Sequence, residues 1–201
     1  MATVDFYFDF VSPYSYLAHT QMADMLKRTN GEVVYKPILL GALHKIHDVQ
    51  SPAFLPVKAK WVVKDCKLWA NHYGVTLKWS KTFPFNSLFF QRAAAYIQKN
   101  LPEKLDLFVT ATFKALWEDG LDPMNQEAIA AHIQSLDIDP QAVLAGTQQD
   151  EIKDVIKANT NEAKEIGLFG APGFKIGEHV LFGQDRLIFV EAALKGELPN
   201  V

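Results

Sequence analysis

Strand-like sequence is confined to the two ends of this 201-residue chain. Aromatic and polar residues alternate through residues 1–10, and apolar residues with a strong strand preference gather over 32–40. Strand sequence returns only at 173–182, where two short runs flank the turn Gly177-Glu178. More than a hundred residues with the pattern of helices lie between these ends. This order predicts one α/β domain that is split by a helical insertion.

A helix start follows the first strand directly. Ser12 is suited to cap free backbone N–H groups, and Pro13 fits the first helical position because it has no N–H to leave unpaired. The pattern predicts a helix over 13–28, which Asn30-Gly31 ends. The chain therefore opens as βαβ, and the closing hairpin with an amphipathic helix after it forms ββα.

The middle of the chain shows helical periodicity. Apolar residues recur at helical spacing from Leu105 to Leu116, and weaker patterns of this kind predict further helices over 57–73, 87–100, 125–135 and 148–166. The predicted domains are one formed by residues 1–50 with 168–201 and a helical insertion over 51–167.

The composition excludes several classes of protein. A net charge of −3 and a pI near 6.1 argue against nucleic acid as a partner. Cys66 is the only cysteine, so the chain can form neither an internal disulfide nor a zinc site of several thiolates, and a packing role is predicted for it. Without a long apolar run or a basic apolar leader, we expect no membrane span and a cytoplasmic location.

The tetrapeptide from Ser12 to Ser15 begins the first helix. With the βαβ…ββα order, an X-Pro-X-X sequence at this point resembles the thioredoxin-like fold, whose redox members carry cysteines at the first and fourth positions. Serine cannot cycle between thiol and disulfide, which excludes that chemistry. A helix N-terminus with a hydroxyl group still suits an anion, and a thiolate from another molecule fits best. The alternative is that Ser12 is an ordinary cap.

Gly170-Ala171-Pro172-Gly173 lies immediately before the hairpin. In thioredoxin-like folds a cis-proline here faces the helix N-terminus, and its loop pairs with an extended peptide ligand. An ordinary proline-glycine turn is the alternative.

The last helix opens with Phe182-Gly183-Gln184-Asp185-Arg186. Free N–H groups there favour a carboxylate, and Asp185 could hold an ammonium group, so the zwitterionic end of an amino acid would satisfy both. A simple helix cap is again the alternative.

Taken together, these motifs resemble a glutathione-using branch of the DsbA-like thioredoxin superfamily, the 2-hydroxychromene-2-carboxylate isomerases and kappa-class glutathione transferases. The most specific segments are 6–17, 55–58, 169–172 and 182–186. The resemblance implies homodimers and a bound glutathione, whose sulfur Ser12 would hydrogen-bond. It also implies that Ala171 pairs with the cysteinyl backbone and that Gln184 and Asp185 hold the γ-glutamyl end, within a site formed by Ser12, Ala171, Pro172, Phe182, Gly183, Gln184 and Asp185.

Two further residues are candidates for contact with the substrate. Lys58 matches a lysine of the family, and Asn86 could face the cleft under the insertion, although a solvated lysine and a helix cap are the alternatives. Members of the family often carry Asn, or Asn-Arg, in the loop before the first helix of the insertion. Residues 48–54 of this sequence contain neither. His44 and His47 lack a third ligand, and no metal site is predicted.

The leading hypothesis is a glutathione-dependent isomerase of an aromatic or chromene-type carboxylate. Its thiolate would add reversibly to a conjugated double bond and so allow cis–trans isomerisation. One alternative is a kappa-like transferase or peroxidase, and another is a non-catalytic thioredoxin-like module that binds extended peptides. Both enzyme hypotheses imply glutathione and a small aromatic molecule as partners.

Overall fold

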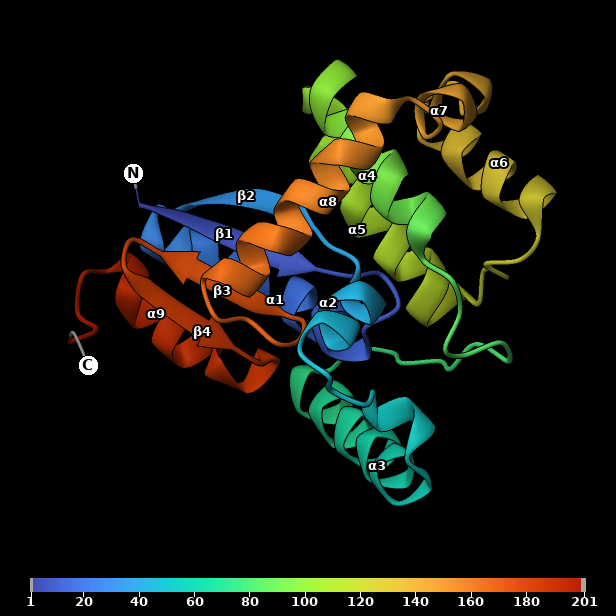
Figure 1. The fold of residues 1–201 in the computed structure, drawn as a ribbon. Coiled ribbons are helices and arrows are strands. Elements are labelled where there is room, and N and C mark those ends of the chain that lie inside the picture. Colours follow the sequence, from blue (N-terminus) through green and yellow to red (C-terminus); the bar gives the residue numbers. More distant parts are fainter. Residues whose placement is uncertain (1, 200–201) are drawn as a thin grey trace.

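The structure is a computed structural model that describes residues 2–199. Its single sheet has the strand order β2-β1-β3-β4, and Figure 1 shows both ends of the chain contributing to it. The central strand β1 (Thr3–Phe8) is parallel to β2 (Glu32–Pro37) and antiparallel to β3 (Gly173–Ile176). The edge strand β4 (His179–Phe182) pairs antiparallel with β3 around the predicted turn. The thioredoxin-like order βαβ…ββα is confirmed.

Helices cover both faces of the sheet. α1 (Pro13–Thr29) and α9 (Leu187–Leu194) pack on the face that carries Phe6, whereas α2 (Leu40–Ile46) and α8 (Asp150–Glu165) pack on the face of Tyr7 (Figure 1). Aromatic rings fill the first interface, in which the centroids of Phe6 and Phe174 lie 5.4 Å apart. Because β1 is covered on both sides, Phe6 and Tyr7 are both fully buried.

The remaining helices form the predicted insertion. They are α3 (Pro56–Tyr73), α4 (Leu88–Asn100), α5 (Leu105–Lys114), α6 (Gln126–Ser135) and α7 (Pro140–Gly146), with the short turns η1 (Pro52–Phe54) and η2 (Pro102–Lys104), and α8 also falls within the predicted bounds. The short turn η4 (Gln184–Arg186) lies outside the insertion, between β4 and α9. The insertion also contacts the sheet, because the Gln91 amide of α4 donates to the carbonyls of Phe8 and Ile38. Across residues 2–199, none of the helices combines the length and apolar character that a membrane span needs. The domain boundaries proposed from the sequence stay a prediction.

The strand predicted over 32–40 is shorter than expected. β2 ends at Pro37, which has no N–H to continue a ladder, and Leu40 instead begins α2. The backbone N–H of Leu40 donates to the Asp9 carboxylate at 2.9 Å. A side chain of the β1–α1 connection thus fixes the start of α2, and this contact cannot be inferred from the local pattern.

The helix that the sequence extends to Leu116 changes its winding after Lys114. Residues from Ala115 to Asp119 form the π-helical turn η3, in which each backbone hydrogen bond spans one more residue than in an α-helix. Trp117 in this turn is buried, and its indole Nε1 donates to the Phe10 carbonyl at 2.9 Å. The widened turn therefore supports the backbone immediately before the N-terminus of α1.

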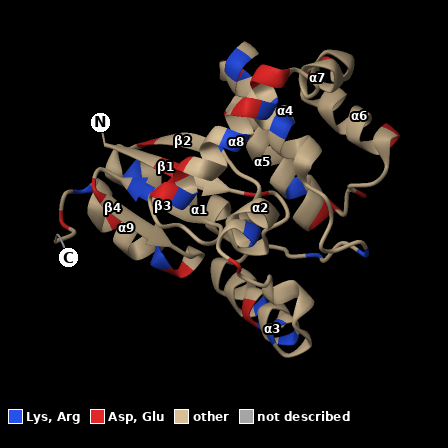
Figure 2. Ribbon diagram, in the orientation of Figure 1, with Lys and Arg blue, Asp and Glu red and all other residues tan. Residues whose placement is uncertain are grey.

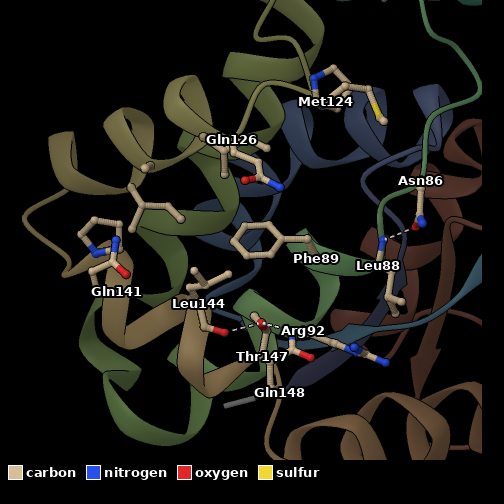
Figure 3. A pocket seen from close by; sticks show the side chains of 15 residues that line it. Asn86, Leu88, Phe89, Arg92, Met124, Gln126, Gln141, Leu144, Thr147 and Gln148 are labelled. Atoms are coloured by element: carbon tan, nitrogen blue, oxygen red, sulfur yellow. Dashed lines mark hydrogen bonds between the residues drawn. The ribbon is translucent and has the colours of Figure 1, made fainter.

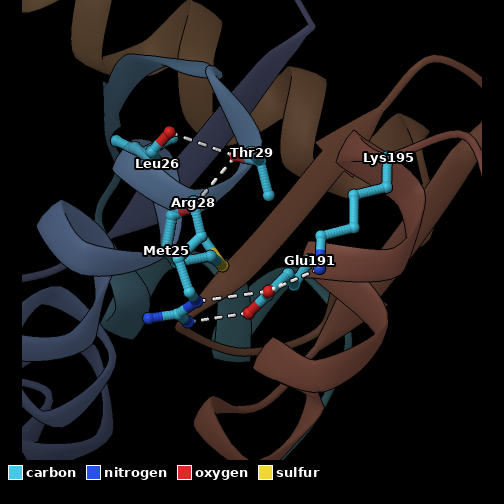
Figure 4. Close-up of polar contacts among 6 residues, drawn as sticks. All are labelled: Met25, Leu26, Arg28, Thr29, Glu191 and Lys195. Atoms are coloured by element: carbon cyan, nitrogen blue, oxygen red, sulfur yellow. Dashed lines mark hydrogen bonds and ion pairs between the residues drawn. The ribbon is translucent and has the colours of Figure 1, made fainter.

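An ion-pair cluster fixes the opposite end of α1. Arg28 donates to both carboxylate oxygens of Glu191 on α9, at 3.2 and 2.7 Å, and Lys195 donates to the same carboxylate (Figure 4). These hydrogen bonds lower the pKa of Glu191 to about 2. This cluster fixes α1 and α9 to each other through Arg28 and Glu191. These are the two helices that flank the candidate site.

Gly146 gives a direct test of packing between α4 and α7. A Cβ atom at this position would lie 2.1 Å from the ring of Tyr96, so a larger residue requires the ring to move. We expect Gly146→Ala to lower the free energy of unfolding by about 1–3 kcal/mol, the usual cost of overpacking. Gly41→Ala is the control because nothing lies within 4 Å of its Cβ position, and it should be neutral or stabilising. Equal denaturation midpoints for both variants would contradict this packing.

Candidate active site at the N-terminus of α1

Ser12 stands at the N-terminus of α1 and joins three segments of the chain. Its backbone N–H donates to the Asp9 carbonyl at 2.9 Å, and its Oγ accepts the N–H of Ser15 at 3.1 Å. The hydroxyl donates to the Ala171 carbonyl at 3.0 Å. The structure thus brings together two of the predicted site residues that are 159 positions apart, and Ser12 is also a helix cap.

The tip of α1 offers groups that suit an anion. Pro13 has no N–H, and the backbone N–H of Tyr14 has no acceptor in the part of the chain that the structure describes. Free N–H groups carry the positive end of the helix dipole. The Ser12 hydroxyl has a single proton, which the Ala171 carbonyl accepts here, so it joins this donor set only when it turns from that carbonyl toward a ligand. With that rotation the residues present fit a thiolate such as glutathione sulfur.

The loop before β3 presents its backbone to the same point. The Ala171–Pro172 peptide bond is cis, and the Pro172 carbonyl accepts the N–H of Gly183 at 3.0 Å. Among the described residues, none accepts the N–H of Ala171. This N–H is available to pair with the backbone of an extended peptide, as the resemblance implies.

The segment before α9 holds a second set of polar groups. Gln184 is only 3% exposed, and its Oε1 accepts the Tyr73 hydroxyl proton at 2.7 Å. This hydrogen bond leaves the amide NH₂ of Gln184 as the donor for a ligand carboxylate. The Asp185 carboxylate forms an ion pair with the Arg186 guanidinium. A ligand ammonium group at this point would therefore share the carboxylate with Arg186. Tyr73 comes from α3, which sequence analysis had not connected with this segment.

Two glycines allow these loops to approach each other. A Cβ atom on Gly170 would lie 2.7 Å from the ring of Phe182, which packs against Phe169 with ring centroids 4.5 Å apart. Gly183 has a φ of +102°, and a Cβ atom there would lie 2.7 Å from the Asp185 carboxylate. The predicted residues Phe182 and Gly183 therefore shape the loop next to Ala171.

Asp9 is a buried carboxylate that sequence analysis missed. One oxygen accepts the N–H of Val11 at 3.1 Å, and the other accepts the N–H of Leu40 at 2.9 Å. Burial raises the pKa of this carboxyl, although the Ser87 side chain and the two backbone N–H groups act in the opposite direction. Asp9 thus connects the loop that carries Ser12 with the start of α2. An acidic residue inside the aromatic run before Ser12 was the available signal.

The helix α3 covers the first turn of α1. The Tyr14 hydroxyl donates to the Asp65 carboxylate at 2.8 Å, and Cys66 beside it is completely buried. Burial raises the pKa of the Cys66 thiol to about 12. This cysteine is therefore a protonated packing residue and not a nucleophile at neutral pH.

Lys58 and Asn86 make no hydrogen bond with the described groups of this arrangement. Lys58 is exposed on the first turn of α3, about 10 Å along the helix axis from Asp65, and Figure 2 shows basic and acidic residues together on α3. Asn86 is exposed, and its Oδ1 accepts the N–H of Leu88 at 3.0 Å at the start of α4. Neither forms a hydrogen bond with Ser12 or Gln184 within the described residues. A substrate contact by either residue stays a prediction.

Comparison with known proteins is consistent with this geometry. The model of the DSBA-like thioredoxin domain family matches residues 3–195. The chain belongs to this family. A solved structure of 2-hydroxychromene-2-carboxylate isomerase shares the fold with a TM-score of 0.85 and 26% identity, covering 96% of this chain and 94% of that one. A cytosolic disulfide reductase from Pseudomonas aeruginosa, 12% identical with a TM-score of 0.64 over 96% of this chain and 95% of its own, shares the fold alone.

Curated relatives fall into two groups of enzymes. A 2-hydroxychromene-2-carboxylate isomerase from Sphingobium xenophagum is 29% identical, over 96% of this chain and 97% of the relative. Glutathione S-transferase kappa 1 from Homo sapiens is 26% identical, over 97% of this chain and 91% of the relative. The resemblance inferred from the sequence motifs is confirmed for this DsbA-like protein.

Proposed function

We propose that this DsbA-like protein is a glutathione-dependent isomerase that acts on an aromatic or chromene-type carboxylate. The relatives reported above are named as an isomerase and a glutathione transferase, and the chain is an enzyme of this kind. The observation that carries the proposal is the Ser12 hydroxyl, which lies at the open N-terminus of α1 and in contact with the Ala171 carbonyl. A serine at this point can hold a thiolate but cannot form a disulfide with it.

Each group of the site would hold a different part of glutathione. The Ser12 hydroxyl would turn its single proton from the Ala171 carbonyl to the sulfur, and the Tyr14 N–H would donate to the sulfur as well. The Ala171 N–H would pair with the cysteinyl backbone. The Gln184 amide and the Asp185 carboxylate would bind the two charges of the γ-glutamyl end. Bound glutathione would supply a thiolate that adds to a conjugated double bond and leaves again after rotation.

Ser12 and the helix tip must stabilise the sulfur in its ionised form. A free thiol has a pKa near 8.5, so a reduction by about two units makes the thiolate the main species at neutral pH. Two units correspond to about 2.7 kcal/mol of preferential binding of the anion. One charge-assisted hydrogen bond and a helix N-terminus supply interactions of this size.

The fate of glutathione tests the proposal against its main alternative. An isomerase returns glutathione unchanged, so its concentration should stay constant while a cis-configured unsaturated aryl carboxylate is converted to its trans isomer. Consumption in proportion to product would instead establish a transferase, the activity that the kappa-class relative favours. If no thiolate absorbance develops on adding glutathione near pH 7, both enzyme proposals fail and a peptide-binding module remains.

Tyr73 provides a test of the γ-glutamyl site. Tyr73→Phe removes the hydrogen bond that orients the Gln184 amide, so we expect glutathione to bind about three- to tenfold more weakly in calorimetric titration. Tyr96→Phe is the matched control, since the Tyr96 hydroxyl makes no hydrogen bond with any described residue and lies on α4. Equal affinities for both variants would remove Gln184 from the proposed site.

The proposal includes a homodimer and a cytoplasmic location. Large apolar side chains on η1 and α3 are exposed, among them Phe54, Val57 and Trp61, at 65, 83 and 59%. Contiguous exposed apolar surface is typical of protein interfaces. Light scattering should give twice the chain mass of 22.6 kDa, whereas the single mass would exclude the dimer.

A further inference from the structure

A cavity of about 590 Å³ lies between α4, α6 and α7 and is separate from the groups that surround Ser12. Phe89, Ile129, Ile133 and Leu144 form its apolar wall, and Figure 3 shows lining side chains from all three helices, among them Phe89, Gln126 and Leu144. Its volume falls within the range of about 300–1,000 Å³ that is usual for small-molecule sites. The cavity therefore has the size and surface of a ligand pocket.

The lining carries a single charge. Arg92 of α4 is the only basic or acidic side chain among the fifteen lining residues, and its Nε is buried without a hydrogen-bond partner. Arg28 and Arg186, in contrast, each pair with a carboxylate. A buried donor on a guanidinium that lacks an acceptor is costly unless a ligand supplies one. The unpaired Nε–H of Arg92 and the lack of acidic side chains among the lining residues point to an anionic ligand.

Uncharged polar side chains complete the pocket. Gln126, Gln141 and Gln148 lie among the lining residues and are exposed, so they stand at its edge rather than in its apolar wall. A ligand with a flat apolar ring system and one carboxylate fits these groups. Its rings would contact the apolar wall, its carboxylate would bind the Arg92 guanidinium, and the glutamine amides would lie at the edge. Guanidinium binds carboxylate through two parallel hydrogen bonds, which also fixes the orientation of the ligand.

We propose that the cavity between α4, α6 and α7 binds a small aromatic carboxylate, with Arg92 as its counter-ion and Phe89 against its ring. Ser12, Ala171 and Gln184 are not among the lining residues, so this site needs no glutathione. Asn86 lines the cavity, and its neighbour Ser87 lowers the pKa of the Asp9 carboxyl, so the cavity borders the candidate active site along this segment.

Calorimetric titration of the full chain without glutathione tests this site. The probe is biphenyl-4-carboxylate, and its neutral match is biphenyl-4-methanol. The carboxylate should bind at least about tenfold more tightly, because hydrogen bonds to a charged group are the stronger ones. Arg92→Met should reduce its affinity to that of the alcohol, and Ala130→Trp should block both probes by filling the cavity, which Ala130 lines.

Two controls separate this site from the proposed active site. Lys99→Met removes a positive charge from the same helix outside the cavity, where Lys99 pairs with Glu151, and should leave binding of the carboxylate unchanged. Ser12→Ala should also bind the carboxylate normally, and excess glutathione should not displace it. If Ser12→Ala weakens binding of the carboxylate and excess glutathione displaces it, the probe binds at α1. This outcome overturns the proposed second site, whatever the activity of the enzyme.

Absence of binding, or equal affinity in wild type and Arg92→Met, would also overturn the proposal. Thermal melting shows first whether Arg92→Met folds. If it does not, Arg92→Lys takes its place, because lysine retains the charge but loses the paired hydrogen bonds. Biphenyl-4-carboxylate must then bind several-fold more weakly to Arg92→Lys than to wild type, and unchanged affinity contradicts the assignment.

Discussion

Replacing Ser12 with alanine should remove most of the turnover and leave the fold intact. The variant loses the hydroxyl that we propose as a donor to glutathione sulfur, while the free Tyr14 N–H and the helix dipole remain. Removing one preorganised donor to a developing or bound anion typically costs a factor of about 10²–10³ in rate. We expect a loss of this size in kcat/KM, together with a higher pKa of the bound thiol, measured by the ultraviolet absorbance of the thiolate against pH.

Ser15→Ala is the matched control for this change. Ser15 lies one turn along the same helix and is completely buried, but its hydroxyl oxygen has no hydrogen-bond partner in the described chain. Its removal should therefore leave both the kinetics and the pKa of the thiol unchanged. Ser12→Ala with wild-type kinetics would show that Ser12 is a helix cap and nothing more.

The stability of Ser12→Ala distinguishes a chemical effect from unfolding. The variant gives up the cap hydrogen bond from the Ser15 N–H, and loss of an N-cap costs about 1 kcal/mol. A domain of this size tolerates such a loss. Denaturant unfolding should thus show a small shift with an unchanged slope, far too small to explain a hundredfold loss of activity.

Replacing Asp9 with leucine should produce the largest loss of stability among these variants. The Val11 and Leu40 N–H groups lose their acceptor, and each buried donor left unpaired costs about 1–3 kcal/mol. We expect the free energy of unfolding to fall by about 2–5 kcal/mol. Because these bonds hold the loop before Ser12, glutathione affinity should fall as well.

Asp5→Leu is the control on the same strand. Asp5 is only half-buried and forms no hydrogen bond through its side chain with the described residues, so its replacement should change stability by less than about 1 kcal/mol. Equal unfolding midpoints for the two variants would show that Asp9 does not connect the loops.

The pH dependence of stability gives a second measurement on Asp9. Burial raises the pKa of this carboxyl above its ordinary 3.8, so the folded state binds its proton more tightly than the unfolded state does. This contribution to stability is fully present below pH 3.8 and declines as the pH rises through the raised pKa. The Asp9→Leu variant should lose this part of the pH profile, and Asp5→Leu should retain it.

Local sequence patterns predicted much of the fold because each depends on neighbouring residues. Alternation through β1, the Ser12-Pro13 helix start and the two-residue turn between β3 and β4 each fix backbone geometry over a few positions. The strand predicted over 32–40 failed at its end, since the decisive contact for Leu40 comes from Asp9, 31 residues away. Regular periodicity in α5 likewise gave no sign of the π-helical turn after it.

By itself, the sequence determined the order of strands and helices, the serine in place of a redox cysteine and the family to which the motifs are similar. Only the tertiary structure decided which side chains meet. The Ser12 hydroxyl contacts Ala171 across 159 residues, Tyr73 orients Gln184 across 111, and the cavity around Arg92 is built by three separate helices. The physical reason is that caps and periodicity act through neighbouring residues, whereas a binding site is formed by packing between distant ones.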